Sequence, residues 1–268
     1  MAFDLRDPRY FQVLTLSLLL GYGLIRLGFD QPLECVALTV AAGLGTQLFF
    51  TWWLKLHRFD PLSPLITTLS LCILLRTSGP WLMALAAVLA MASKFLIRVD
   101  GKHVFNPSNG AIAVMILVSG EAWISPAQWG SQAWSAFLFA CLAGLVLSRA
   151  RRADIALAFL VTFAALVLAR ALYLGDPWSI PMKQMQSGAL LLFAFFMISD
   201  PKAVPDRRLE RILFAVLVAA AGFTLQIGYF KPHGLMVALF ALSPLVPLLD
   251  RWRPLEPAAR FQWSNPTV

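Results

Sequence analysis

The sequence predicts an all-α polytopic membrane protein of about ten transmembrane helices, built as two inverted repeats of five helices. Three observations predict this fold class: the apolar composition, the recurrence of long apolar segments, and a weak internal repeat at a spacing of about 125 residues. Of the 268 residues, 59% are hydrophobic and 13% are charged, whereas soluble globular chains carry roughly 25% charged residues. So much apolar surface exceeds what one soluble core can bury.

Long apolar segments recur over nearly the whole chain, at residues 10–28, 33–54, 80–97, 133–147, 155–174, 212–227 and 235–249. Several of them reach the roughly 20 residues that a helix needs to cross about 30 Å of hydrocarbon. Backbone groups in lipid must be hydrogen-bonded within the protein, and the alternating pattern of barrel strands does not occur. The segments are therefore predicted to be transmembrane helices, the first of them retained and not removed as a signal peptide.

Three further apolar segments are conspicuously short, at residues 62–76, 107–119 and 188–199. Each is started or stopped by proline. Paired short segments interrupted by Pro or Gly indicate discontinuous helices near the midplane of a transporter, because half-helix ends direct their dipoles into a cavity. Tilted helices, or helices that end in thick loops, are the alternative.

The formal charge of +8 is concentrated on one side of the predicted topology. If ten segments alternate across the bilayer, 17 of the 22 Lys and Arg lie at the amino terminus, in four connections and in the tail. Residues 121–132, on the other side, contain none. By the positive-inside rule both termini are cytoplasmic, in the inner membrane of a bacterial cell. The predicted orientation in the membrane explains the excess of basic residues, so nucleic acid is not expected as a partner.

The internal repeat divides the chain into two halves. The motif Phe-Asn-Pro-Ser-Asn-Gly at residues 105–110 is opposite Phe-Lys-Pro-His-Gly at residues 230–234, and each precedes an apolar helix. Because five elements per half is an odd number, the second copy is expected to be inverted. The predicted divisions are a cytoplasmic N-terminus (1–9), a first five-helix repeat (10–120), an external loop (121–132), a second repeat (133–250) and a cytoplasmic tail (251–268).

We call the motifs at residues 105–110 and 230–234 the first and the second break, because each interrupts the chain before an apolar helix. Polar side chains at these breaks, together with Asp200, form the candidate ligand or ion pathway in a cavity between the halves. The first break brings amides and a hydroxyl to a helix amino end, whose N–H groups favour an anion or polar ligand; helix capping is the alternative role. Asp200 is expected to cap the next segment, to pair with Lys202, or to bind a cation or proton. The candidate pathway residues are Asn106, Ser108, Asn109, Asp200, Lys231 and His233.

Four basic residues near the first break, Lys94, Arg98, Lys102 and His103, are candidates for phosphate contacts. Lipid phosphates or the cytoplasmic surface are the main expected partners, and a flavin or nucleotide phosphate is the alternative. Inverted symmetry puts His103 and His233 on opposite faces, and the three cysteines are widely spaced, so no metal site is expected. No nucleophile with a base, phosphate loop or carboxylate pair indicates an autonomous catalytic site.

Two segments resemble the NqrB/RnfD family. Residues 93–109 read Ser-Lys-Phe-Leu-Ile-Arg-Val-Asp-Gly-Lys-His-Val-Phe-Asn-Pro-Ser-Asn, and residues 186–201 end in Phe-Phe-Met-Ile-Ser-Asp-Pro. The family comprises membrane subunits of the sodium-pumping NADH:quinone oxidoreductase and of the Rnf ferredoxin:NAD electron-transport complex, with a ten-helix inverted-repeat fold similar to urea transporters. The resemblance covers roughly residues 9–251. It implies the lipid bilayer and other membrane or periplasmic redox subunits as partners.

The resemblance also bears on the cofactor. In the coupled pumps, FMN is attached to a threonine of a Ser/Thr-Gly-Ala-Thr motif, in the external loop ahead of the Phe-Phe-Met helix. Here that loop, residues 174–186, contains no threonine, and in the nearby Ser-Gly-Ala-Leu at residues 187–190 Leu190 has no hydroxyl to esterify. Covalent FMN is therefore not expected, and Ser179 is only a remote candidate for attachment. Non-covalent FMN or riboflavin stays open.

The leading functional hypothesis is an integral membrane subunit of RnfD/NqrB type in redox-linked transport or electron transport. The chain is then at most one subunit of a redox-driven ion translocase. The first alternative is a channel or transporter for a small polar solute or a flavin precursor. The second alternative is a membrane scaffold for a redox partner.

Overall fold

The computed structural model describes residues 7–125, 153–252 and 254. Residues 7–125 form the helices α1 (Pro8–Arg26), α2 (Leu33–Trp53), α3 (Leu62–Leu74), α4 (Pro80–Leu96) and α5 (Pro107–Ser119). Two short antiparallel pairs accompany them: β1 (Leu75–Thr77) pairs with β4 (Ala122–Ile124), and β2 (Arg98–Val99) pairs with β3 (Lys102–His103).

Residues 153–252 begin with α7 (Ala153–Leu174), α8 (Ser179–Met185) and α9 (Gly188–Leu192), which continues into the π-helical turn η2 (Phe193–Met197). The helix α10 (Arg208–Phe223) likewise continues into the π-helical turn η3 (Thr224–Gly228). The last two helices are α11 (Gly234–Leu242) and α12 (Leu245–Trp252).

Local sequence signals mark several helix ends. Pro80 and Pro107 occupy the first turns of α4 and α5, where a fixed φ suits the helix and the missing N–H has no intrahelical acceptor to lose. Asn106 caps α5 through its side chain, and Gly120 ends the same helix in the left-handed region, at φ 66°. The short helices predicted from the prolines are therefore short in the structure as well.

Within the described residues, four helical segments are long and apolar enough to cross a membrane: α2, α7, Arg208–Gly228 and Gly234–Trp252. The apolar helices α3, α4, α5 and Gly188–Met197 are shorter. These helices and their hydropathy fit a multi-pass helical membrane protein. The count of ten helices and the inverted repeat stay predictions, and the predicted segment 133–147 lies outside the described residues.

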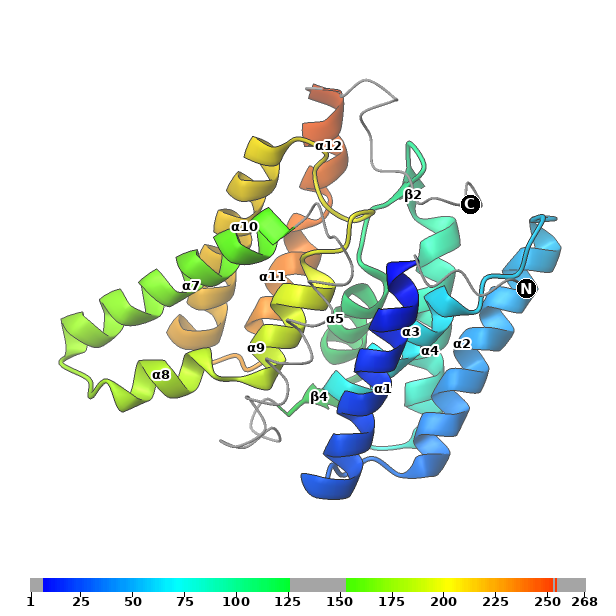
Figure 1. Cartoon of the computed structure of the whole chain (residues 1–268), viewed down its shortest axis with the longest axis horizontal. Coiled ribbons are helices and arrows are strands. Elements are labelled where there is room, and N and C mark those ends of the chain that lie inside the picture. The colour runs from blue at the N-terminus through cyan, green and yellow to red at the C-terminus, as the bar shows by residue number, and fades with distance from the viewer. Residues whose placement is uncertain (1–6, 126–152, 253, 255–268) are drawn as a thin grey trace.

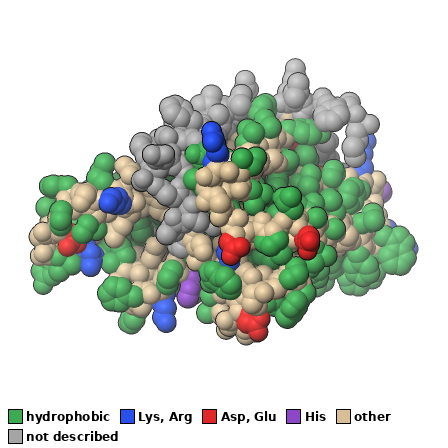
Figure 2. All heavy atoms as spheres, turned by 90° about the horizontal axis from the view of Figure 1, so that it is seen from below, with side chains coloured by type: hydrophobic (Ala, Val, Ile, Leu, Met, Phe, Trp, Pro, Cys, Tyr) green, Lys and Arg blue, Asp and Glu red, His purple; other side chains and the backbone are tan. Residues whose placement is uncertain are grey.

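The helix α2 turns its polar side inward and its apolar side outward. Thr39, Gly43 and Gln47 are buried along one face, whereas Leu48 is 58% exposed and Trp52 is 75% exposed. Figure 2, which views the molecule from below, shows hydrophobic side chains over much of the described surface, with charged side chains scattered between them. The exposed apolar side of α2 fits a surface that faces lipid.

Helices α5 and α11 lie in the middle of the molecule, between α1 to α4 on one side and α7 and α10 on the other (Figure 1). The two middle helices pack against each other. Phe105, just before α5, stacks on Phe240 of α11 with the ring centroids 4.7 Å apart. The two candidate breaks of the chain thus lead into neighbouring helices.

Three segments have a secondary structure that differs from the one predicted from the sequence. The predicted loop 121–132 contains strand β4, because Ala122–Ile124 pairs with the strand that follows α3. The loop 174–186 contains the helix α8. The apolar segment 235–249 is divided, since Pro244 follows the end of α11 at Leu242 and precedes α12.

Candidate functional site

The amino end of α5 is joined to the segment after η2 by a hydrogen bond between two candidate residues. Asn106 Nδ2 donates to Asp200 Oδ2 at 3.2 Å. Asn106 Oδ1 accepts from the Asn109 backbone N–H at 3.0 Å and from Ser108 Oγ at 2.9 Å. Asn106 therefore acts both as a helix cap and as a link to a residue 94 positions away. We call Asn106, Ser108, Asn109 and Asp200 the junction.

Asn109 links the junction to α11. Its Nδ2 donates to the Met236 carbonyl oxygen at 3.2 Å. Its Oδ1 is buried and has no hydrogen-bond partner among the described residues, and the residue is only 1% exposed. A buried amide oxygen without a partner is costly, so this atom is a natural place for a ligand, an ion or a water molecule to bind.

Asp200 is partly buried and interacts with the chain that follows it. Its Oδ1 accepts from the Lys202 backbone N–H at 3.0 Å, in the turn that follows η2. Burial raises the pKa of the Asp200 carboxyl above its ordinary value, while the Lys202 N–H, the Lys202 charge and Asn106 act in the opposite direction. A carboxylate in this setting can take up a proton or a cation.

Lys102 makes a second connection between the two parts of the chain. Its ammonium donates to the Val204 carbonyl at 2.7 Å, to Asp206 Oδ1 at 3.1 Å and to Asp250 Oδ2 at 2.6 Å. Asp250 Oδ1 also accepts from the Asp206 backbone N–H at 2.9 Å. These acceptors match the three donors of an ammonium. Phosphate binding by Lys102 stays a prediction and has to compete with these contacts.

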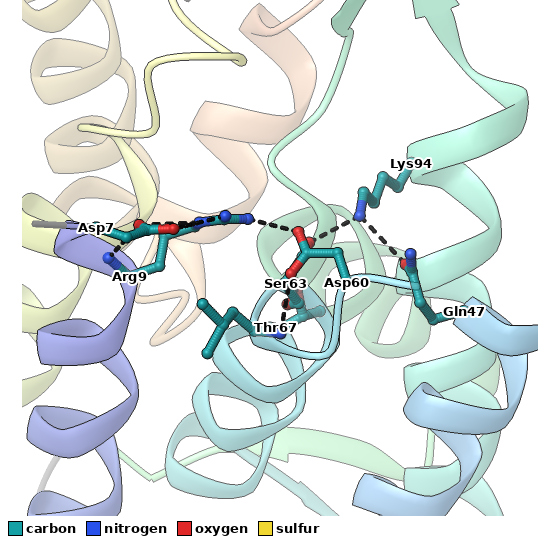
Figure 3. Close-up of polar contacts among 8 residues, drawn as sticks. Asp7, Arg9, Gln47, Asp60, Ser63, Thr67 and Lys94 are labelled. Atoms are coloured by element: carbon teal, nitrogen blue, oxygen red, sulfur yellow. Dashed lines mark hydrogen bonds and ion pairs between the residues drawn. The ribbon is translucent and has the colours of Figure 1, made fainter. Parts of the chain in front are cut away.

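The other three basic candidates lie close to one another. Lys94 is 6% exposed and donates to Gln47 Oε1 and Ser63 Oγ (Figure 3). His103 pairs with Arg98 across the β2–β3 hairpin, and Arg98 donates to the Gly101 carbonyl at 3.0 Å. Arg98 Nε and His103 Nδ1 are buried and have no hydrogen-bond partner among the described residues. Phosphate contacts by these residues stay predictions.

Lys231 and His233 are not joined to the junction. Lys231 is exposed and His233 is partly buried at the start of α11. In the described part of the chain, no hydrogen bond or ion pair connects either side chain with Asn106, Asn109 or Asp200. The charge of Lys231 instead acts on His233, where burial first and this charge second lower the imidazole pKa.

The remaining site predictions concern a flavin, a metal and a cavity. Ser179 is exposed and is the first residue of α8. Among the described residues, no group of three His, Cys, Asp or Glu side chains could hold a metal ion. A surface depression of about 600 Å³ lies at the end of α2, and no junction residue lines it. It is lined by Leu48, Thr51, Trp52, Trp53, Lys55 and Leu56.

The hydrogen-bond partners of Lys94 and Lys102 were not predicted from the sequence. Asp206 and Asp250 hold Lys102, and Gln47 and Ser63 hold Lys94. One local signal was available for Gln47, which is a lone amide in the apolar helix α2. Polar side chains inside membrane helices normally face the interior of the bundle, where they find partners.

Comparison with known proteins gives two kinds of match. A family model described as NQR2, RnfD, RnfE family matches residues 119–257, a range that includes Asp200 but not Asn106. A relative from Escherichia coli O81 (strain ED1a), named as a subunit of an ion-translocating oxidoreductase complex, is 30% identical over 137 residues. The protein of the same name from Escherichia coli (strain K12 / DH10B) is 29% identical over 137 residues.

These alignments cover 50% of this chain and 36% of each relative. The chain thus matches little more than a third of the length of these curated relatives. The family model covers more than half of the 268 residues. On this match, together with its apolar helices, the chain belongs to the NQR2, RnfD, RnfE family of membrane proteins.

Proposed function

We propose that this chain is an integral membrane subunit of a redox-driven ion translocase, and that its ion pathway passes the junction. The family match and the name of the two relatives, which assigns them to an ion-translocating oxidoreductase complex, support this function. The proposed partners are the lipid bilayer and other membrane or periplasmic redox subunits. The proposed location is a bacterial inner membrane with both termini cytoplasmic.

The observation that carries the proposed pathway is the Asn106–Asp200 hydrogen bond, which joins the amino end of α5 to the segment after η2. Asp200 supplies a carboxylate, and Asn109 Oδ1 supplies a buried oxygen with no partner among the described residues. Oxygen ligands of this kind suit a proton or a hard monovalent cation. An ionisable residue beside short membrane helices is expected to serve transport, because an unneeded charge there would be costly.

A covalent flavin does not fit the segment that would carry it. Residues 174–186 contain no threonine, and the exposed Ser179 is their one hydroxyl-bearing residue. The proposed function therefore uses no covalently attached FMN in this chain. Electrons would be carried by partner subunits or by a flavin bound without a covalent link.

The test measures redox-driven ion uptake by inverted membrane vesicles that contain the chain together with its native partner subunits. Uptake of ²²Na⁺ and of protons is followed after addition of NADH or reduced ferredoxin. We expect Asp200→Asn to reduce uptake at least tenfold per folded molecule, because the amide keeps the size of the side chain and one acceptor oxygen but loses the charge. Asp176→Asn is the matched control, since Asp176 pairs with Arg170 at 3.2 Å, away from the junction.

Equal uptake in the Asp200→Asn and Asp176→Asn vesicles would remove the junction from the ion pathway. Uptake of a solute or ion that does not depend on the electron donor would favour a channel or transporter instead. A chain that is dispensable for uptake but needed to retain a redox subunit in the membrane would favour a scaffold.

A further inference from the structure

Three helices bring polar groups to one buried point in the first part of the chain. Gln47 projects inward from α2 and is 1% exposed, Ser63 lies in the first turn of α3, and Lys94 projects from α4. Lys94 Nζ donates to Ser63 Oγ at 2.8 Å and to Gln47 Oε1 at 3.2 Å (Figure 3). Lys94 also lies over the Phe95 ring, with Nζ 5.1 Å from the ring centroid.

Both hydrogen-bond partners of Lys94 are neutral. In the described part of the chain the Lys94 ammonium forms no ion pair. Asp60 is the carboxylate whose charge acts on it most, but Asp60 Oδ2 accepts from Arg9 at 2.5 Å and Oδ1 accepts from the Leu62 backbone N–H at 3.1 Å. A buried ammonium without a carboxylate partner loses hydration that two neutral oxygens replace only in part.

The same two partners suit either charge state of the lysine. As an ammonium, Lys94 donates to both oxygens. As an amine, it can still donate to the Gln47 oxygen and accept from the Ser63 hydroxyl, which rotates freely between donor and acceptor roles. Loss of the proton therefore leaves no buried polar group unsatisfied at this point. A fixed structural cation, in contrast, would normally be held by a carboxylate.

We propose that Lys94 is a proton-binding site, at which Gln47 and Ser63 hold both the ammonium and the amine form of the lysine. The proton exchanges with solvent at the end of the molecule where the Asp60 side chain is 25% exposed. The charged and titratable side chains around Lys94 are Arg9 of α1, Asp60 before α3, Arg98 and His103 of the β2–β3 hairpin, and Lys202 after η2. Only one of them is acidic, so the surroundings do not lock the lysine in its charged form.

This site is separate from the junction, and its test needs neither a redox partner nor ion transport. The purified protein is labelled with [¹³C,¹⁵N]lysine in detergent micelles, and the Cε signals of the six lysines are followed against pH. Lys94→Met identifies the Lys94 signal by its loss, and Lys183→Met does the same for an exposed lysine. We expect the Lys94 signal to change at least one pH unit below the ordinary lysine value of about 10.4, because two neutral partners replace the lost hydration only in part.

A Lys94 signal that stays in the ammonium form up to the ordinary lysine value of about pH 10.4 would overturn the proposal. If Lys94→Met does not fold, Gln47→Glu gives an independent answer. A carboxylate at this position favours the ammonium, so the signal change that belongs to Lys94 should move upward by at least about one pH unit. An unshifted titration in Gln47→Glu would show that the titrating lysine is not the one held by Gln47 and Ser63.

Discussion

His103 is a buried imidazole in the β2–β3 hairpin, 6% exposed, next to the residues of the junction in sequence. Burial, together with the charges of Lys202, Lys94 and Arg98, lowers its pKa to about 3. The unfolded chain keeps the ordinary histidine value of about 6.5. Below pH 6.5 the unfolded chain therefore binds a proton that the folded protein does not bind, and the folded state loses stability as the pH falls toward about 3.

The consequence of this pKa can be measured by unfolding the protein in detergent between pH 7.5 and pH 5. One proton of difference corresponds to about 1.4 kcal/mol per pH unit, so we expect His103 to remove about 2 kcal/mol of stability by pH 5. His103→Gln should flatten this dependence. His57→Gln, at an exposed histidine, should leave it as in the wild type. Parallel pH profiles for the wild type and His103→Gln would contradict the assignment.

At the scale of elements, the start of α11 packs directly against η3. A Cβ atom on Gly234 would lie 2.6 Å from the Gln226 backbone nitrogen and 2.9 Å from Leu225 Cβ. Because backbone atoms cannot move aside as a side-chain end can, any larger residue at this position should separate the two helices. The glycine of the second break thus has a packing role as well as a place in the repeat.

We expect Gly234→Ala to reduce the free energy of unfolding by about 1–3 kcal/mol, as overpacking of a tight contact usually does. The lower melting temperature in detergent is the measurement. Gly45→Ala is the control, because a Cβ at Gly45 in α2 has no heavy atom within 4 Å. Alanine also has the higher helix propensity, so this variant should be neutral or slightly more stable. A wild-type melting temperature for Gly234→Ala would show that the contact is not tight in solution.

The segment that contains α8 gives a second prediction at the scale of elements. Since residues 174–186 contain no threonine, the protein should carry no covalent flavin even after coexpression with a flavin transferase. The denatured protein on a gel should therefore show no flavin fluorescence. A fluorescent band that disappears in Ser179→Ala would make Ser179 the attachment site and would contradict this expectation.

At the scale of the whole molecule, the distribution of basic residues predicts the orientation in the membrane. A reporter fused after Val268 should be cytoplasmic, and one inserted after Ser125, in the loop without Lys or Arg, should be external. The two positions are read with paired reporters that are active on one side of the membrane only. If both positions report the same side, the ten-helix topology is wrong.

The parts of the fold that could be predicted are those that depend on neighbouring residues in the sequence. The amino ends of α4 and α5 follow from Pro80 and Pro107, and the apolar spans follow from hydropathy. These features depend on residues within one or two helical turns, which the sequence displays directly. Two of the predicted site residues, Asn106 and Asp200, are hydrogen-bonded to each other, and their role in a pathway stays a prediction.

The sequence by itself thus determined that the chain is apolar and helical, where several helices begin, and which polar residues interrupt them. Only the tertiary structure decided their partners, because Asp200 is 94 residues from Asn106 and Asp250 is 148 residues from Lys102. It also placed Lys94 between Gln47 and Ser63 and left Lys231 exposed. Contacts over such separations depend on how helices pack side by side, and no periodicity within a single segment records that arrangement.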